Sequence, residues 1–130
     1  MEFDLSQIKL TCIDKEKGLI LPKRVSRELS YLCGILVGDG SIYTRQDKND
    51  YIIKCVGNPK DEQELYHKII GPYFKRVFGF IPIIKYQDSN RSYGFVLYSK
   101  SLFTYLTEII GLLKGRKNHN LGIPTIFKKG

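Results

Sequence analysis

Two helix-like segments, each followed by a pair of strand-like segments, constrain the fold of this 130-residue chain more than any other feature. Residues 25–37 carry apolar side chains at helical spacing, and Ser26 is suited to cap the start of that helix. Two strand-like segments then flank a polar turn at residues 47–50, and the same hairpin pattern returns around residues 88–91. The expected strands are residues 41–45, 51–56, 81–87 and 92–98.

Two further helices complete the order helix, hairpin, helix, hairpin, helix. Asn58 and Pro59 mark the start of the second helix, which Pro72 is expected to kink or split. Ser99 or Ser101 begins the third helix. Two αββ units in tandem, followed by a helix, predict an α+β fold with four antiparallel strands and the helices on one face of the sheet. The other face is then open to a ligand.

No low-complexity segment or linker divides the chain, so we expect one core. Residues 1–24 are punctuated by Gly18 and Pro22 and are expected to form an N-terminal arm. Residues 25–130 are expected to form the single folded domain, with a basic tail after Leu112.

Asp39 occupies an unusual position for an acidic residue. It follows an apolar run that ends in Val37 and Gly38, and it precedes Gly40, a pattern that indicates the end of a helix. A helix C-terminus carries about half a negative charge, which disfavours a carboxylate there by up to about 1 kcal/mol. Two interpretations remain: an ordinary Asp-Gly turn, or a carboxylate placed to bind a metal ion.

The charge balance points to a polyanionic partner. The formal net charge is +8, which favours nucleic acid first and an acidic membrane surface second. The longest apolar stretch, residues 31–38, is far shorter than the roughly 20 residues that a membrane span needs, so no membrane insertion is expected. The three cysteines are widely separated and form no CxxC pair, which indicates a reducing, intracellular (cytoplasmic) compartment and argues against a zinc site.

The segment from Leu32 to Gly40, which reads LCGILVGDG, resembles the LAGLIDADG signature of homing endonucleases. Leu21-Pro22-Lys23 before the motif and Ser41-Ile42 after it are similar to the archaeal and intein-associated branch of that family. The order of elements is similar to the family's αββαββα unit. Gly115-Arg116-Lys117 followed by Ile123-Pro124 resembles the end of the first half in two-motif members.

The resemblance implies a saddle-shaped four-stranded antiparallel sheet and a metal-dependent endonuclease that cuts both strands of duplex DNA as a homodimer. One acid from each subunit, here Asp39 with the adjacent Gly38, would hold Mg²⁺ or another divalent cation such as Mn²⁺. Gly34 and Gly38 lie four residues apart, so they share one helix face that a second helix can approach closely. Together with Cys33 and Val37 they form the expected dimer interface.

The motif departs from the family pattern at two positions. The sixth position is often Asp in the family and is Val37 here, and the second is commonly Ala and is Cys33 here. One copy of the motif occurs, which is typical of homodimeric members. Residues 123–130 also stand where a two-motif member would begin its second half, so a half-domain of a longer enzyme is an alternative.

DNA reading is expected on the sheet face opposite the helices. Side chains alternate along a strand, so Ser41, Tyr43 and Arg45 share one face when counted from Asp39. Lys and Gln can read base edges, and Arg and Lys can also hold phosphates. The favoured residues beyond the first strand are Lys54, Lys85, Gln87, Arg91 and Tyr93. A solvated sheet face without a ligand is the alternative interpretation.

The family also carries a basic residue near its metal ions, late in the last helical region. Arg116 aligns best with that residue, and Lys114 and Lys117 lie within two positions of it. By this likeness all three are catalytic candidates, whereas a phosphate-binding tail would explain them without catalysis. The alternative functions are a non-cleaving DNA-binding regulator on the same fold and an RNA maturase.

Overall fold

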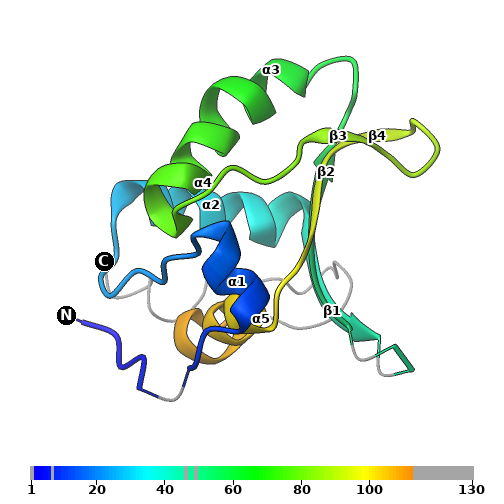
Figure 1. Ribbon diagram of the computed structural model, residues 1–130. Helices are drawn as coiled ribbons and strands as arrows, with labels where there is room; N and C mark the ends of the chain where they lie inside the picture. The colour runs from blue at the N-terminus through cyan, green and yellow to red at the C-terminus, as the bar shows by residue number, and fades with distance from the viewer. Residues whose placement is uncertain (1, 7, 46, 49, 113–130) are drawn as a thin grey trace.

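A four-stranded antiparallel sheet is the centre of the molecule. The computed structural model describes residues 2–6, 8–45, 47–48 and 50–112, which form an α+β fold. The strand order is β1-β2-β4-β3, so the two hairpins meet through β2 and β4. Figure 1 shows the helices on one side of the sheet. The elements are α1 (Cys12–Lys17), α2 (Arg27–Asp39), β1 (Gly40–Arg45), β2 (Asp50–Gly57), α3 (Gln63–Leu65), η1 (Tyr66–Ile70), α4 (Gly71–Phe78), β3 (Lys85–Gln87), β4 (Ser92–Tyr98), α5 (Lys100–Thr104) and η2 (Tyr105–Ile110).

Helix α2 begins at its predicted cap and runs past its predicted end. The Ser26 Oγ atom accepts a hydrogen bond from the Leu29 N–H over 3.1 Å, which confirms the cap. The helix ends at Asp39 rather than at the expected Val37. Its buried stripe consists of Leu29, Leu32, Cys33 and Leu36. These side chains attach α2 to the helix-covered face of the sheet.

The second helical stretch, formed by α3, η1 and α4, runs without a gap through Pro72, where a kink or split was expected. Proline has no backbone N–H, so a regular α-helical ladder cannot continue unchanged through it. The π-helical segment η1 ends at Ile70, two residues before the proline, and the Gly71 N–H donates to the Tyr66 carbonyl five residues back. The start differs from the prediction. Asn58 accepts a backbone hydrogen bond inside a turn, and the helix begins only at Gln63.

Strand β3 is shorter than its sequence pattern predicts. Residues 81–87 were expected to pair, but the strand spans only Lys85–Gln87. Pro82 lacks the N–H that a ladder needs, and Phe80 and Ile84 pack against the core instead. Strand β4 has its predicted bounds, Ser92–Tyr98.

Ser99 caps the third helical stretch, formed by α5 and η2. Its Oγ atom accepts a hydrogen bond from the Leu102 N–H over 3.1 Å. The alternative cap, Ser101, is buried and accepts a hydrogen bond from the Thr11 N–H instead. Gly111 ends the stretch with a φ of 93°, a left-handed conformation that favours glycine. Within the described part of the chain, none of the helices combines the length and hydropathy needed to cross a membrane.

Side-chain alternation gives the sheet two different faces. Ile42, Ile53 and Phe95 point into the core beneath the helices. Residues directly opposite each other on neighbouring strands share a face, so Ser41 and Lys54 lie side by side on the other face. We call that second face the open face. It is formed by Ser41, Tyr43, Arg45, Asp50, Ile52, Lys54, Val56, Lys85, Gln87, Ser92, Gly94, Val96 and Tyr98.

The described part of the N-terminal segment packs against the rest of the domain. The buried Phe3 ring meets Tyr105 edge-on, with ring centroids 6.2 Å apart. The Tyr105 hydroxyl donates to the Pro22 carbonyl over 2.8 Å, and the Ile20 N–H donates to the Phe78 carbonyl over 2.8 Å. This segment therefore contributes to the same core, and it contains helix α1, which the sequence pattern does not predict.

Replacing Phe3 by alanine tests that contribution. We expect Phe3→Ala to lower the free energy of unfolding by about 3 kcal/mol, because a truncated buried Phe loses its transfer free energy and leaves a cavity. Ile13→Ala is the control: Ile13 is 64% exposed, so the change should stay within about 0.5 kcal/mol. Urea unfolding measures both variants. Equally small effects would show that the segment does not stabilise the fold.

Candidate nucleic-acid interface and metal ligand

Asp39 lies at the corner where α2 turns into β1. Its side chain is exposed, and Gly40 begins the strand directly after it. The Gly40 N–H donates to the Leu36 carbonyl, and a Cβ atom on Gly40 would lie 2.7 Å from that carbonyl oxygen. Only glycine fits this turn without displacing backbone. The close turn therefore holds Asp39 at the helix end, next to the sheet.

A second carboxylate, that of Glu62, acts electrostatically on the same buried thiol as Asp39, that of Cys55. The pKa of the Cys55 thiol is raised to about 11, first by burial and also by the negative charges of Asp39 and Glu62. The Oε2 atom of Glu62 is buried and has no hydrogen-bond partner among the described residues. That oxygen lies against Gly57 at the end of β2. The sequence indicates Glu62 only as an acid near a helix start, so its position at the sheet comes from the tertiary structure.

The donor set at the corner fits a hard divalent cation only in part. Carboxylate and backbone carbonyl oxygens are the ligands that Mg²⁺ prefers, and Asp39 and Gly38 offer one of each at exposed positions. Within the described residues, however, no group of three or more His, Cys, Asp or Glu side chains could hold a metal ion. A complete coordination shell at Asp39 therefore needs further ligands, such as those of a second subunit or of a phosphate.

The glycine face of α2, formed by Gly34 and Gly38, is exposed. A Cβ atom on either residue would meet no atom within 4 Å among its described surroundings. Val37 is half-buried and packs against the core. Cys33 is only 1% exposed and belongs to the core, so its expected place in the dimer interface is corrected. The reason is the helical period, which turns Cys33 about 100° away from Gly34.

The open face brings together most of the residues that were predicted to read DNA. Strand pairing places the following residues on the open face: Ser41, Tyr43, Arg45, Lys54, Lys85 and Gln87. Arg91 is exposed at the end of the β3–β4 turn. Ile52 is only 1% exposed although it lies on this face, between Tyr43 and Tyr98 on the neighbouring strands. The face thus surrounds a small apolar centre with polar side chains.

Tyr93 does not lie on the open face, so the expectation for this residue is wrong. It is 8% exposed on the helix-covered side of β4. Its hydroxyl lies 2.6 Å from His67 Nε2, and its ring meets those of Tyr66 and Tyr86 edge-on. Alternation within β4 puts Gly94, not Tyr93, on the open face.

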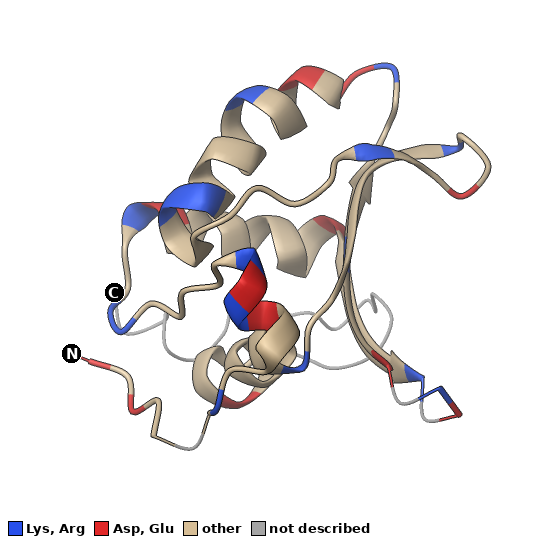
Figure 2. Ribbon diagram, viewed as in Figure 1, with Lys and Arg blue, Asp and Glu red and all other residues tan. Residues whose placement is uncertain are grey.

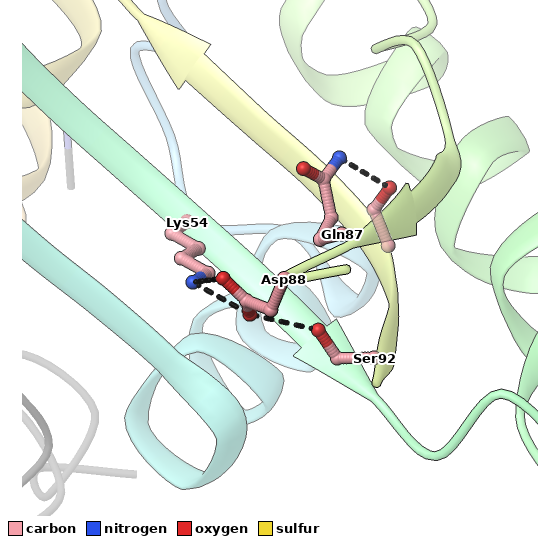
Figure 3. A network of polar contacts seen from close by, with 5 residues as sticks. Lys54, Gln87, Asp88 and Ser92 are labelled. Atoms are coloured by element: carbon pink, nitrogen blue, oxygen red, sulfur yellow. Dashed lines mark hydrogen bonds and ion pairs between the residues drawn. The ribbon is translucent and has the colours of Figure 1, made fainter. Parts of the chain in front are cut away.

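Two basic side chains of the open face are paired with acids. Arg45 Nη2 lies 2.8 Å from Asp50 Oδ2 and 3.3 Å from the Tyr98 hydroxyl. Lys54 Nζ lies 2.9 Å from both carboxylate oxygens of Asp88 (Figure 3). The sequence assigns both acids only to turns. The pairs hold the cationic donors in place and lower the net charge of the face.

The basic residues are not confined to the open face. Figure 2 shows Lys and Arg along the helices, in the turns and at the sheet edge. Lys114, Arg116 and Lys117 lie outside the described residues, so their assignment stays a prediction. The described charge distribution alone therefore does not single out one binding surface.

Comparison with known proteins gives no family assignment. No protein-family model matches the sequence, and no curated protein matches it. The functional interpretation therefore depends on the corner at Asp39, the glycine face and the open face.

Two glycine substitutions test the corner. Gly40→Ala should destabilise the protein by about 1–3 kcal/mol, because its Cβ would overlap the Leu36 carbonyl. Gly34→Ala, in helix α2, is the control; at a concentration where the protein is monomeric it should stabilise the fold by about 0.5–1 kcal/mol, because alanine is the better helix former and has free space there. Urea unfolding compares them. Two equal effects would contradict the close contact at Gly40.

Proposed function

We propose that this chain is a site-specific, metal-dependent endonuclease of duplex DNA that acts as a homodimer, with a LAGLIDADG-type arrangement. The observation that carries the proposal is the combination at one corner of the fold. An exposed Asp39 ends a helix whose glycine face is uncovered, and it stands beside a polar sheet face on which no described helix packs.

Duplex DNA is the occupant that the open face fits best. The side chains of the open face include hydroxyl, amide, ammonium and guanidinium groups, which are the groups that read base edges and hold phosphates. The major groove of B-DNA admits a two-stranded β-ribbon, and this sheet presents two hairpins. The formal charge of +8 would attract the polyanion at long range.

A second copy of the chain would complete the metal site. Two carboxylates that approach each other need a cation between them, and a twofold contact through Gly34 and Gly38 would bring the two Asp39 residues together. A hard divalent cation such as Mg²⁺, when bound there, would supply electrophilic activation of a phosphodiester. In this arrangement Asp39 orients the cation, and the neighbouring open face positions the DNA strand.

DNA binding without cleavage is the second candidate. It is favoured by the lack, among the described residues, of any group of three metal-binding side chains. Such a protein would still use the open face to read DNA, and Asp39 would serve only as the residue at the turn. Metal-dependent nicking of duplex DNA separates the two candidates.

Substitution of Asp39 tests the catalytic assignment. Asp39→Asn should abolish metal-dependent cleavage, because a neutral amide does not replace a carboxylate as a ligand of Mg²⁺, while DNA affinity should be unchanged or slightly higher. Asp4→Asn makes the same change at an exposed N-terminal position and should cleave like the unmodified protein. Gel assays of cleavage and fluorescence anisotropy of binding measure both properties. Full cleavage by Asp39→Asn would refute the metal assignment.

Substitution of Gly34 tests the homodimer. Because no atom lies within 4 Å of a Cβ at this position, Gly34→Leu should leave the monomer folded and block a second helix. We expect its self-association to weaken at least tenfold in sedimentation equilibrium, with and without duplex DNA. Lys75→Leu adds a leucine at an exposed position of α4 and should leave association unchanged. An equally stable dimer in Gly34→Leu would place the interface elsewhere.

A further inference from the structure

An ion pair whose carboxylate also accepts a hydrogen bond from a third side chain lies across the open face. Lys54 extends from β2 and donates to Oδ1 and Oδ2 of Asp88, at 2.9 Å each. The Ser92 hydroxyl donates to Oδ2 of the same carboxylate, also over 2.9 Å. Figure 3 shows Asp88 reaching from the β3–β4 turn toward Lys54, with Ser92 beneath it. The carboxylate is therefore fixed from two strands.

The backbone conformation of the turn brings Asp88 into this position. Asp88, Ser89 and Asn90 have φ values of 53°, 57° and 68°. Non-glycine residues in this left-handed region cost about 1 kcal/mol each, although Asp and Asn tolerate it better than most. An exposed ion pair contributes only about 0–1 kcal/mol to stability. The pair therefore does not offset the conformational cost of the turn.

The pair keeps hydrogen-bonding capacity after its internal contacts are made. A carboxylate accepts about four hydrogen bonds, and Lys54 and Ser92 use three of these positions on Asp88. The Lys54 ammonium has three N–H donors, of which two are directed at Asp88. The side chains of Lys54 and Asp88 are 25% and 48% exposed, respectively. One acceptor and one donor thus remain side by side, within reach of a ligand on the open face.

The charge of the pair determines what that ligand can be. Asp88 stays ionised, since hydrogen bonds from Lys54 and Ser92 lower its pKa. A carboxylate repels phosphate oxygens, and it also neutralises Lys54, the cation that is paired with it, although the charge of Arg91 acts on the same carboxylate. A nucleobase edge is the part of duplex DNA that can satisfy a fixed acceptor. In the major groove, adenine and cytosine present an amino group, whereas guanine and thymine present a carbonyl oxygen.

We infer that Asp88 is a specificity-determining residue which selects an amino base, adenine or cytosine, over a keto base at one position of each half-site. The inference rests on the proposed function. The Asp88 carboxylate accepts a hydrogen bond from the exocyclic amino group of that base. Lys54 donates its remaining N–H to a neighbouring N7 or carbonyl oxygen. A keto base would set its oxygen against the carboxylate. Ser92 acts as a positioning residue for this contact.

Selection from a pool of random-sequence duplexes tests the inference. The unmodified protein should enrich adenine or cytosine over guanine or thymine by about tenfold at one position, since a good base contact gives about 1–3 kcal/mol of discrimination. Asp88→Asn keeps the size of the side chain and suits the left-handed turn, and its amide can also donate to a keto oxygen. Its preference at that position should fall below about twofold, while the rest of the selected sequence is retained.

Glu64→Gln is the matched control. Glu64 is also an exposed acid paired with a lysine, Lys68, but it lies on α3, so its loss should leave the selected sequence unchanged. Circular dichroism of all three proteins verifies their folding. A selected sequence with the same amino-base preference in Asp88→Asn would overturn the inference and leave DNA reading intact. If the unmodified protein enriches no sequence at all, both the inference and the proposed function are refuted.

Discussion

The close contact between Gly40 and the Leu36 carbonyl sets the geometry on which the rest of the domain depends. It joins α2 to β1 without a connecting loop, so the buried stripe of the helix and the first strand reach the core together. Overpacking by one methyl group costs about 1–3 kcal/mol, a large share of the 5–15 kcal/mol that stabilises a typical domain. The same contact fixes Asp39 at an exposed corner. The fold therefore holds the Asp39 carboxylate at a helix C-terminus, where the helix dipole disfavours a negative charge.

The two faces of the sheet differ in the side chains that they carry. The helix-covered face of the sheet is filled with apolar and aromatic side chains, among them Phe95 and the Tyr66–Tyr93 pair. The open face instead carries ion pairs, hydroxyls and amides around Ile52. Exposed ion pairs add little stability, so the pairs Arg45–Asp50 and Lys54–Asp88 contribute little to folding. Our proposals for DNA reading follow from this difference.

Local features were predictable because short-range chemistry determines them. The caps at Ser26 and Ser99 each follow from one side chain, and both are present. The expectations for Cys33 and Tyr93 failed for a different reason. Each was assigned a face by its neighbours in the sequence, whereas the helical period and the strand register decide which way each side chain points.

The sequence by itself determined the order of helices and hairpins, the α+β class and the acid at the helix end, because periodicity, caps and turn residues act over a few positions. Only the tertiary structure decided how β2 pairs with β4, that the described N-terminal segment joins the core, and that Asp88 meets Lys54, 34 positions away in the chain. Such contacts depend on the register between strands from different hairpins. That register is set by the packing of the whole core and has no local signature in the sequence.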